Sequence, residues 1–120
     1  MTALLLGYGD VERATRFFVD ALGFAEEWDV RNDEGELVRS HVRLGDTVLM
    51  LDHPGAHGVL SPRQAGGVTH LVVVSVEDVD GHHRRAASAG ATILAPPADR
   101  PWGRDYEVRD PEGYVFSFIS

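Results

Sequence analysis

Apolar residues form strand-like runs and one helix-like stripe in each half of the chain. In the second half, a run at residues 68–76 is rich in β-branched side chains, which is typical of a strand. A segment of helical character follows to Ala89, Gly90 stands where a helix would stop, and a second apolar run covers residues 91–95. The pattern predicts a strand–helix–strand unit.

The first half contains the same unit. Asp10-Val11 recurs 68 residues later as Asp78-Val79, and Ala21-Leu22-Gly23-Phe24 resembles Ala89-Gly90-Ala91. Apolar residues recur at helical spacing from Val11 to Leu22, with Asp10 as the expected N-cap and Gly23 as the expected stop. A repeated unit indicates an internally duplicated fold.

Each half continues with three more short apolar or alternating runs. The predicted strands cover residues 3–8, 24–31, 36–44 and 47–51 in the first half, and 68–76, 91–95, 104–109 and 114–119 in the second. A proline-rich loop is expected at 96–101. The prediction is an α+β fold in which two βαβββ modules form a curved mixed sheet around a cleft, with the helices on the outer face. The 120 residues make one domain, with module 1 at about 1–52, a linker at about 53–66 and module 2 at about 67–120.

Alternation within two strands separates core from cleft positions. In the strand at 36–44, one face carries Leu37, Arg39, His41 and Arg43, and the other face, expected in the core, carries Val38, Ser40, Val42 and Leu44. In the last strand, Tyr114, Phe116 and Phe118 are expected in the core, and Val115, Ser117 and Ile119 are expected to line the cleft.

The composition excludes several classes of partner and of binding site. The formal charge of −8 and the lack of a clustered basic face argue against a nucleic-acid partner. Absence of cysteine removes disulfides and thiolate metal sites, and all 11 basic residues are arginine. No apolar stretch approaches the ~18 residues of a membrane span, so we expect no membrane partner and a cytoplasmic protein.

Three motifs resemble the vicinal oxygen chelate superfamily of glyoxalase I, extradiol dioxygenases, fosfomycin-resistance enzymes and bleomycin-resistance proteins. They are Asp10-Val11-Glu12-Arg13-Ala14 with the segment to Phe24, Val76-Glu77-Asp78-Val79-Asp80, and Arg109-Asp110-Pro111-Glu112-Gly113. The resemblance implies a ligand cleft between the modules and a homodimer that often completes the clefts. It also implies a divalent metal, typically held by His or Gln on the first strand and Glu on the last strand of each module.

The family's ligand positions fall on poor metal ligands here. They match Ala3, Leu49 or Met50, Leu71 with His70 beside it, and Ser117. A hard divalent ion needs several oxygen or imidazole ligands, so we expect no metal cofactor and binding without chemistry, as in the bleomycin-resistance proteins. Two alternatives stay open. One is a glyoxalase- or dioxygenase-like enzyme whose divalent metal is held by His41, His70 and a carboxylate such as Asp52 or Glu107; the other is a metal-free enzyme with His41 or His70 as general base.

The expected ligand is a small aromatic or cationic molecule, since flat side chains occur near the predicted cleft and the charge is negative. Trp28, Trp102 and Tyr106 are candidates for the flat walls of the ligand site. In the alternative interpretation, one of them packs beneath the proline-rich loop. The full set of candidate ligand-binding residues is His41, His70, Trp28, Trp102, Tyr106, Met50 and Ser117.

Overall fold

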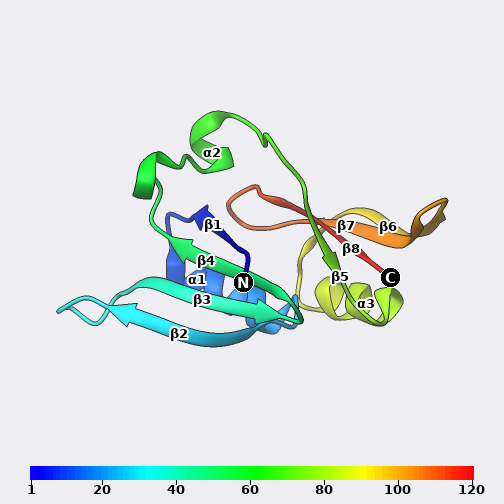
Figure 1. The fold of residues 1–120 in the computed structure, drawn as a ribbon, viewed down its shortest axis with the longest axis horizontal. Helices are drawn as coiled ribbons and strands as arrows, with labels where there is room; N and C mark the ends of the chain where they lie inside the picture. Colours follow the sequence, from blue (N-terminus) through cyan, green and yellow to red (C-terminus); the bar gives the residue numbers. More distant parts are fainter.

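The computed structural model describes all 120 residues and shows two βαβββ modules in sequence (Figure 1). The first module contains β1 (Ala3–Gly7), α1 (Val11–Asp20), β2 (Ala25–Arg31), β3 (Leu37–Leu44) and β4 (Thr47–Asp52). The second contains β5 (Val72–Ser75), α3 (Val79–Ser88), β6 (Thr92–Arg100), β7 (Gly103–Arg109) and β8 (Val115–Ile119). The linker carries a short 3-10 helix, η1 (Ala56–Gly58), and α2 (Pro62–Ala65). The predicted α+β class with two repeated modules is confirmed.

Both modules have the same topology and the same local signals. The strand orders are β1-β4-β3-β2 and β5-β8-β7-β6, and in each sheet the first strand runs parallel to the last. Asp10 and Asp78 cap α1 and α3 alike, because each carboxylate accepts a hydrogen bond of 3.0 Å from the backbone N–H three residues on. Gly23 ends the first helical segment at a φ of +75°, which favours glycine. The internal repeat in the sequence is therefore one structural unit used twice.

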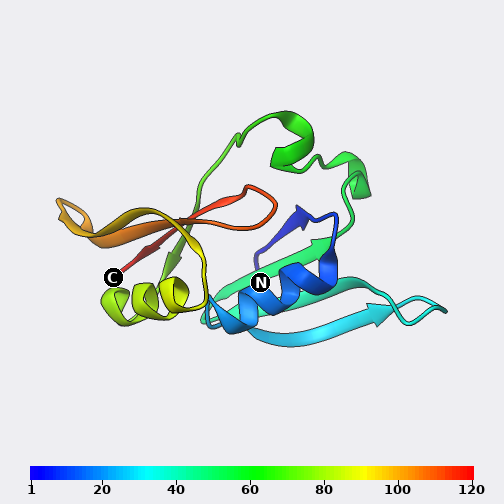
Figure 2. The ribbon, with the colours of Figure 1, turned by 180° about the vertical axis from the view of Figure 1, so that it is seen from behind.

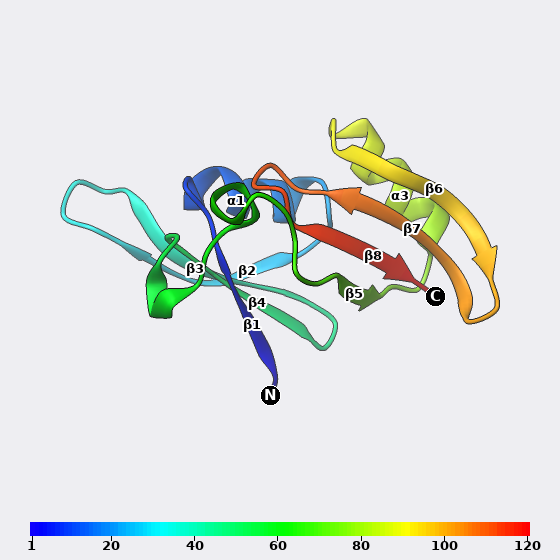
Figure 3. The same ribbon diagram turned by 90° about the horizontal axis from the view of Figure 1, so that it is seen from above.

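The eight strands form two four-stranded sheets, sheet A (β1–β4) and sheet B (β5–β8), rather than one continuous curved sheet. Each helix covers one face of its own sheet, and we call the uncovered face the open face. Sheet A presents its open face in Figure 1, and Figure 2 brings α1 and α3 to the front. Sheet B presents its own open face in the view from above, with α3 behind it (Figure 3). Within one chain the open faces thus point in different directions instead of closing on one another.

Two predicted strand boundaries in the second module are wrong. β6 continues through the prolines expected to form a loop, and its pairing with β7 is irregular between Ala95 and Ala98, where Pro96 and Pro97 lie. An edge strand tolerates proline because one side of it needs no hydrogen-bond donors. β5 begins at Val72 rather than at residue 68, and only its four residues from Val72 to Ser75 pair with β8. His70 therefore lies just before the strand.

The predicted alternation holds in β8 and only partly in β3. Phe116 and Phe118 are fully buried on the helix side of sheet B, as expected. In β3, Ser40 and Val42 face α1, and the Ser40 hydroxyl lies 2.7 Å from that of Thr15. Leu37, however, is buried in the core although we placed it on the opposite face with Arg39, His41 and Arg43, because the pairing of β2 with β3 shifts register beside it.

One hydrophobic core joins the two modules. It comprises 20 buried residues from both halves of the chain. The Phe18 ring of α1 packs edge-on against Phe116 of β8 at 5.4 Å, and the Tyr8 and Tyr114 rings lie 5.3 Å apart. No helix is long and apolar enough to cross a membrane. The molecule measures 47 × 30 × 28 Å, with the modules side by side along the long axis.

His82 of α3 links the modules through hydrogen bonds at both ring nitrogens. Its Nε2 donates to the carbonyl oxygen of Leu22 at 2.7 Å, so its Nδ1 accepts from the hydroxyl of Tyr106 at 2.6 Å. Burial lowers the pKa of His82, opposed by the bond to Leu22 and assisted by the nearby Arg85 charge. The neutral imidazole is therefore part of the module junction.

We expect this junction to weaken in acid. Because the folded-state pKa of His82 is lowered, the unfolded chain takes up the proton first as the pH falls below about 6.5, and the free energy of unfolding falls with it. Urea titration at about pH 8 and about pH 5 measures how much the free energy of unfolding falls between the two conditions. This fall should be smaller for His82→Gln than for the wild type. Equal losses in both proteins would show that His82 does not titrate on unfolding.

Candidate functional site

A row of four side chains crosses the open face of sheet A. Trp28 of β2 pairs with His41 of β3, His41 pairs with Met50 of β4, and Met50 pairs with Leu5 of β1. Residues paired across strands project to the same face, so the four side chains form one line, which we call the Trp28 row. The Trp28 and His41 ring centroids are 4.6 Å apart at a tilt of 47°, and Trp28 is 45% exposed. The row offers a flat indole and an apolar floor.

The polar groups of the row leave one hydrogen-bonding atom without a partner. His41 Nε2 is buried and has no hydrogen-bond partner. The arginines beside His41 on the same strand are already occupied, since Arg43 donates to Glu27 at 2.6 Å and Arg39 donates to the buried Asp52 at 2.8 Å. An unpaired buried nitrogen is costly, and a polar group of a ligand would satisfy it.

The Trp28 row ends at a pocket that contains His70. Leu5 lines this pocket of about 280 Å³ together with side chains from β1, from the segment between β4 and β5, and from the residue before β8, chiefly Leu4, Val59, Val68, His70 and Tyr114. The exposed His70 ring lies 6.0 Å from that of Tyr114. The structure thus brings Trp28, His41 and Met50 into one line, and that line meets the pocket of His70.

Ser117 and Trp102 lie on the second module. Ser117 of β8 is flanked in register by Val73 of β5 and Glu107 of β7, on the open face of sheet B. Val73 and Ser117 occupy the places that Leu5 and Met50 hold in sheet A. Trp102 lies at the turn between β6 and β7, is 67% exposed, and donates its indole N–H to Asp105 at 3.2 Å. These residues are separate from the Trp28 row within one chain.

The expected position of Tyr106 at a cleft wall is wrong. Its side chain is fully buried on the helix side of sheet B, stacked on Phe118 at 5.6 Å. Its hydroxyl donates to His82 beneath α3. Alternation along β7 explains the difference, because Tyr106 shares its face with the core residue Val108.

The positions that match the family's metal ligands do not gather metal-binding side chains. Of the two candidates on β4, Met50 faces the open side and Leu49 is fully buried. No group of three or more His, Cys, Asp or Glu side chains comes together in the chain. His41, His70 and Asp52 or Glu107, which we considered as an alternative ligand set, therefore do not converge.

Sequence reasoning missed Leu5 and Val73 as neighbours of Met50 and Ser117. Their place follows from the parallel pairing of the first strand of each module with the last. The signal that was available is the offset of 68 residues, which relates Leu5 to Val73 as it relates Asp10 to Asp78. Applying this offset to individual strand positions would have identified Leu5 and Val73 as equivalent residues of the two modules.

Comparison with known proteins agrees with this architecture. Residues 2–118 match the model of the Glyoxalase/Bleomycin resistance protein/Dioxygenase superfamily. The protein Mb0911c of Mycobacterium bovis is 33% identical over 113 residues, which cover 90% of this chain and 74% of that protein. The anthracycline biosynthesis protein DnrV of Streptomyces peucetius is 35% identical over 77 residues, which cover 63% of this chain and 26% of DnrV.

Among solved structures, TioX from Micromonospora sp. ML1 superposes with a TM-score of 0.80 at 33% identity, covering 98% of this chain and 97% of TioX. The two βαβββ modules share one strand order, and the sequence match covers nearly the whole chain. The chain therefore belongs to the Glyoxalase/Bleomycin resistance protein/Dioxygenase superfamily.

Proposed function

We propose that the protein binds a flat, apolar small molecule at the Trp28 row and does not transform it. The observation that carries the proposal is the half-exposed Trp28 indole beside His41, whose buried Nε2 has no hydrogen-bond partner. An aromatic ring stacks on the indole, and a polar substituent near the ring edge reaches His41. Met50 supplies a soft, adaptable floor for ligands of differing outline.

The exposed Trp28 indole also suits a ligand that is cationic. Trp28 lies within the sequence Glu26-Glu27-Trp28-Asp29 on β2, and Glu27 and Asp29 are both paired with arginines. Glu26 and Asp29 pair with Val42 and Ser40, so their carboxylates lie on the α1 side of sheet A rather than beside the indole. The preference for a cation therefore depends on the cation–π contact that the half-exposed indole offers and on the net charge of −8.

Binding without a metal remains part of the proposal. Met50 and Ser117 occupy equivalent places in the two modules, where a thioether and a hydroxyl are weak ligands for a hard divalent ion. The relationship to DnrV, whose name refers to anthracycline biosynthesis, suggests a suitable probe. Anthracyclines combine a planar ring system with a basic amine.

The binding experiment uses an anthracycline, a bleomycin and a neutral planar aromatic compound. We expect saturable heat in calorimetric titration with at least one of them, and recovery of the ligand with unchanged mass after prolonged incubation. Elemental analysis of protein purified without chelator should show no stoichiometric divalent metal. A ligand recovered in altered form, or one metal ion per chain, would replace this proposal with an enzymatic function.

We further propose that two copies of the chain pair through their open faces, so that Ser117 and Trp102 of one copy approach the Trp28 row of the other. Trp28, Val30, Leu71 and Val73 are between 37% and 58% exposed on or beside the two open faces. Apolar groups gathered on uncovered sheet faces favour burial against another protein surface. Sheet A carries Trp28, His41 and Met50, whereas Ser117 and Trp102 belong to the second module.

Charge placed on an open face should break such a dimer. Val73→Glu is expected to shift the mass measured by light scattering from two chains to one, because a carboxylate would be buried without a partner. Leu60→Glu is the matched control, since Leu60 is 59% exposed in the linker and Val73 is 58% exposed on β5. A wild-type protein that runs as a monomer at all concentrations would contradict the pairing.

A further inference from the structure

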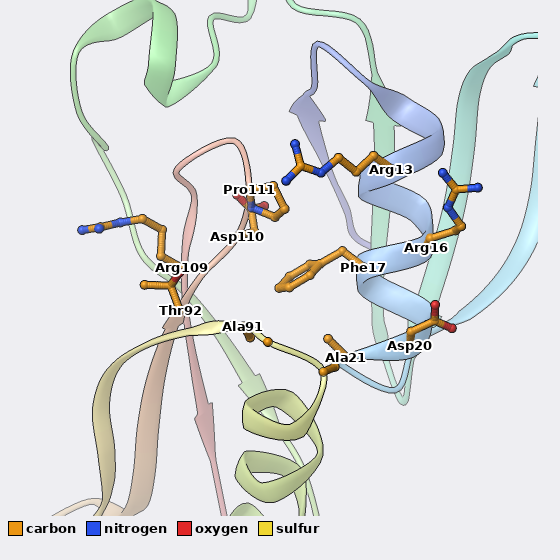
Figure 4. Close-up of a pocket in the computed structure, with 12 residues that line it drawn as sticks. Arg13, Arg16, Phe17, Asp20, Ala21, Ala91, Thr92, Arg109, Asp110 and Pro111 are labelled. Atoms are coloured by element: carbon orange, nitrogen blue, oxygen red, sulfur yellow. The ribbon is translucent and has the colours of Figure 1, made fainter.

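A second pocket lies on the helix side of the molecule, where the two modules meet. It has a volume of about 390 Å³ and is lined by α1, by the segment that joins α3 to β6, and by the turn between β7 and β8. Figure 4 shows Phe17 of α1 directed into the space between these elements, with Pro111 opposite. This pocket shares no residue with the Trp28 row or with the pocket of His70.

Arginine is concentrated around this pocket in an otherwise acidic protein. Three of its 12 lining residues are Arg13, Arg16 and Arg109, whereas the chain as a whole carries a formal charge of −8. Figure 4 shows the Arg13 side chain extending from α1 toward Pro111, above the Phe17 ring. Arg109 lies on the opposite wall, and its exposed guanidinium extends away from α1.

Two of these arginines lack a counter-ion. Of the 11 arginines, only Arg13, Arg84 and Arg109 donate to no acceptor through their guanidinium and have no carboxylate within 4.0 Å. Two of the three line this pocket. An unpaired, exposed guanidinium changes rotamer toward an anion without breaking an existing ion pair.

The carboxylates near the pocket limit the charge that it accepts. Asp110 is directed inward, where its carboxylate accepts from the Tyr8 hydroxyl at 2.6 Å and from three backbone N–H groups. Asp20 also places a carboxylate in the lining of the pocket. The positive potential is therefore modest, which suits a single carboxylate better than a doubly charged phosphate.

The remaining walls are apolar and flat. Phe17 is half-buried and packs against the core, so its ring is held in place while one side faces the pocket. Ala21 and Ala91 add small apolar surfaces on either side. A planar ring stacks on Phe17 in this space, and the volume accommodates one or two fused rings.

We infer that this pocket binds a small aromatic monocarboxylate, with its ring against Phe17 and its carboxylate between Arg13 and Arg109. The site is independent of the Trp28 row, which favours cationic ligands. The protein therefore has two ligand sites of opposite charge preference, one on the open face of sheet A and one between α1 and the second module.

The test compares 1-naphthoate with the neutral isostere 1-naphthamide by calorimetric titration and by chemical-shift mapping of the full chain. Naphthoate should bind saturably and shift the Phe17 and Gly90 amides without shifting the Trp28 indole, and naphthamide should bind about tenfold or more weakly. Arg13→Gln and Arg109→Gln should each weaken naphthoate binding about tenfold. Arg84→Gln, the third unpaired arginine and outside the pocket, should leave the affinity unchanged.

Four results would overturn the inference. They are no saturable binding of naphthoate, equal binding of acid and amide, equal weakening by all three arginine variants, and shifts confined to the Trp28 row. Circular dichroism confirms that each glutamine variant is folded, as expected for exposed arginines without ion pairs. Phe17→Leu provides a second readout, since it should weaken naphthoate binding while leaving both arginines in place.

Discussion

Replacing Phe18 by alanine should lower the free energy of unfolding by about 3–5 kcal/mol, the range typical of a buried phenylalanine. Phe18 is fully buried on α1, and its ring lies 5.3–6.0 Å from the rings of Tyr8, Phe17, Phe24 and Phe116. Phe116 belongs to the second module, so the substitution opens a cavity where the modules meet. Urea unfolding followed by circular dichroism measures the loss.

Phe17→Ala is the matched control, because Phe17 is the neighbouring residue on α1 but is only half-buried. We expect Phe17→Ala to lower the free energy of unfolding by about 1–2 kcal/mol, since Phe17 buries less apolar surface than Phe18. In both variants the two modules should unfold together in one transition. Two separate transitions, or equal losses for Phe17→Ala and Phe18→Ala, would contradict a core shared between the modules.

Asp110 should give the protein a component of stability that is lost as the pH rises. Burial raises the pKa of Asp110 from its ordinary 3.8 to about 6, although the Tyr8 hydroxyl and the backbone amides of Glu112, Gly113 and Tyr114 oppose the shift. Because the folded state holds this proton more tightly, the contribution is complete below about pH 4 and disappears as the pH rises through about 6. The shift corresponds to about 3 kcal/mol as an upper value.

The comparison of wild type with Asp110→Asn isolates this contribution from that of His82, which acts in the opposite direction. The asparagine oxygen can still accept from the three backbone N–H groups, but the side chain no longer titrates. The difference in unfolding free energy between the two proteins should therefore move in favour of the variant between about pH 4 and about pH 7. A constant difference over this range would show that Asp110 ionises normally in the folded protein.

Local signals explain which parts of the fold were predictable. Asp10, Asp78 and Gly23 act within one helical turn, so the sequence alone identifies both helix starts and the first helix end. The strand β6 was cut short because proline is a strong local stop signal, and only the position of β6 at the sheet edge makes Pro96 and Pro97 acceptable. Edge position is a tertiary property that the local pattern does not contain.

The site was predictable as a set of residue types but not as an arrangement. Trp28, His41 and Met50 were each candidates, but their alignment depends on the register of three strands, including an irregularity in the pairing of β2 with β3. Tyr106 was misplaced because alternation divides a strand into two faces without saying which face a helix covers. The separation of the strands into two sheets explains why Ser117 and Trp102 lie apart from the Trp28 row.

The most direct test of the proposed function is calorimetric titration of an anthracycline into wild type, Trp28→Ala and Trp28→Phe. The account predicts saturable binding to the wild type, a loss of affinity of about tenfold or more in Trp28→Ala, and substantial recovery in Trp28→Phe, because a flat ring is restored beside His41. Equal affinity for all three proteins would place the ligand elsewhere and contradict the account.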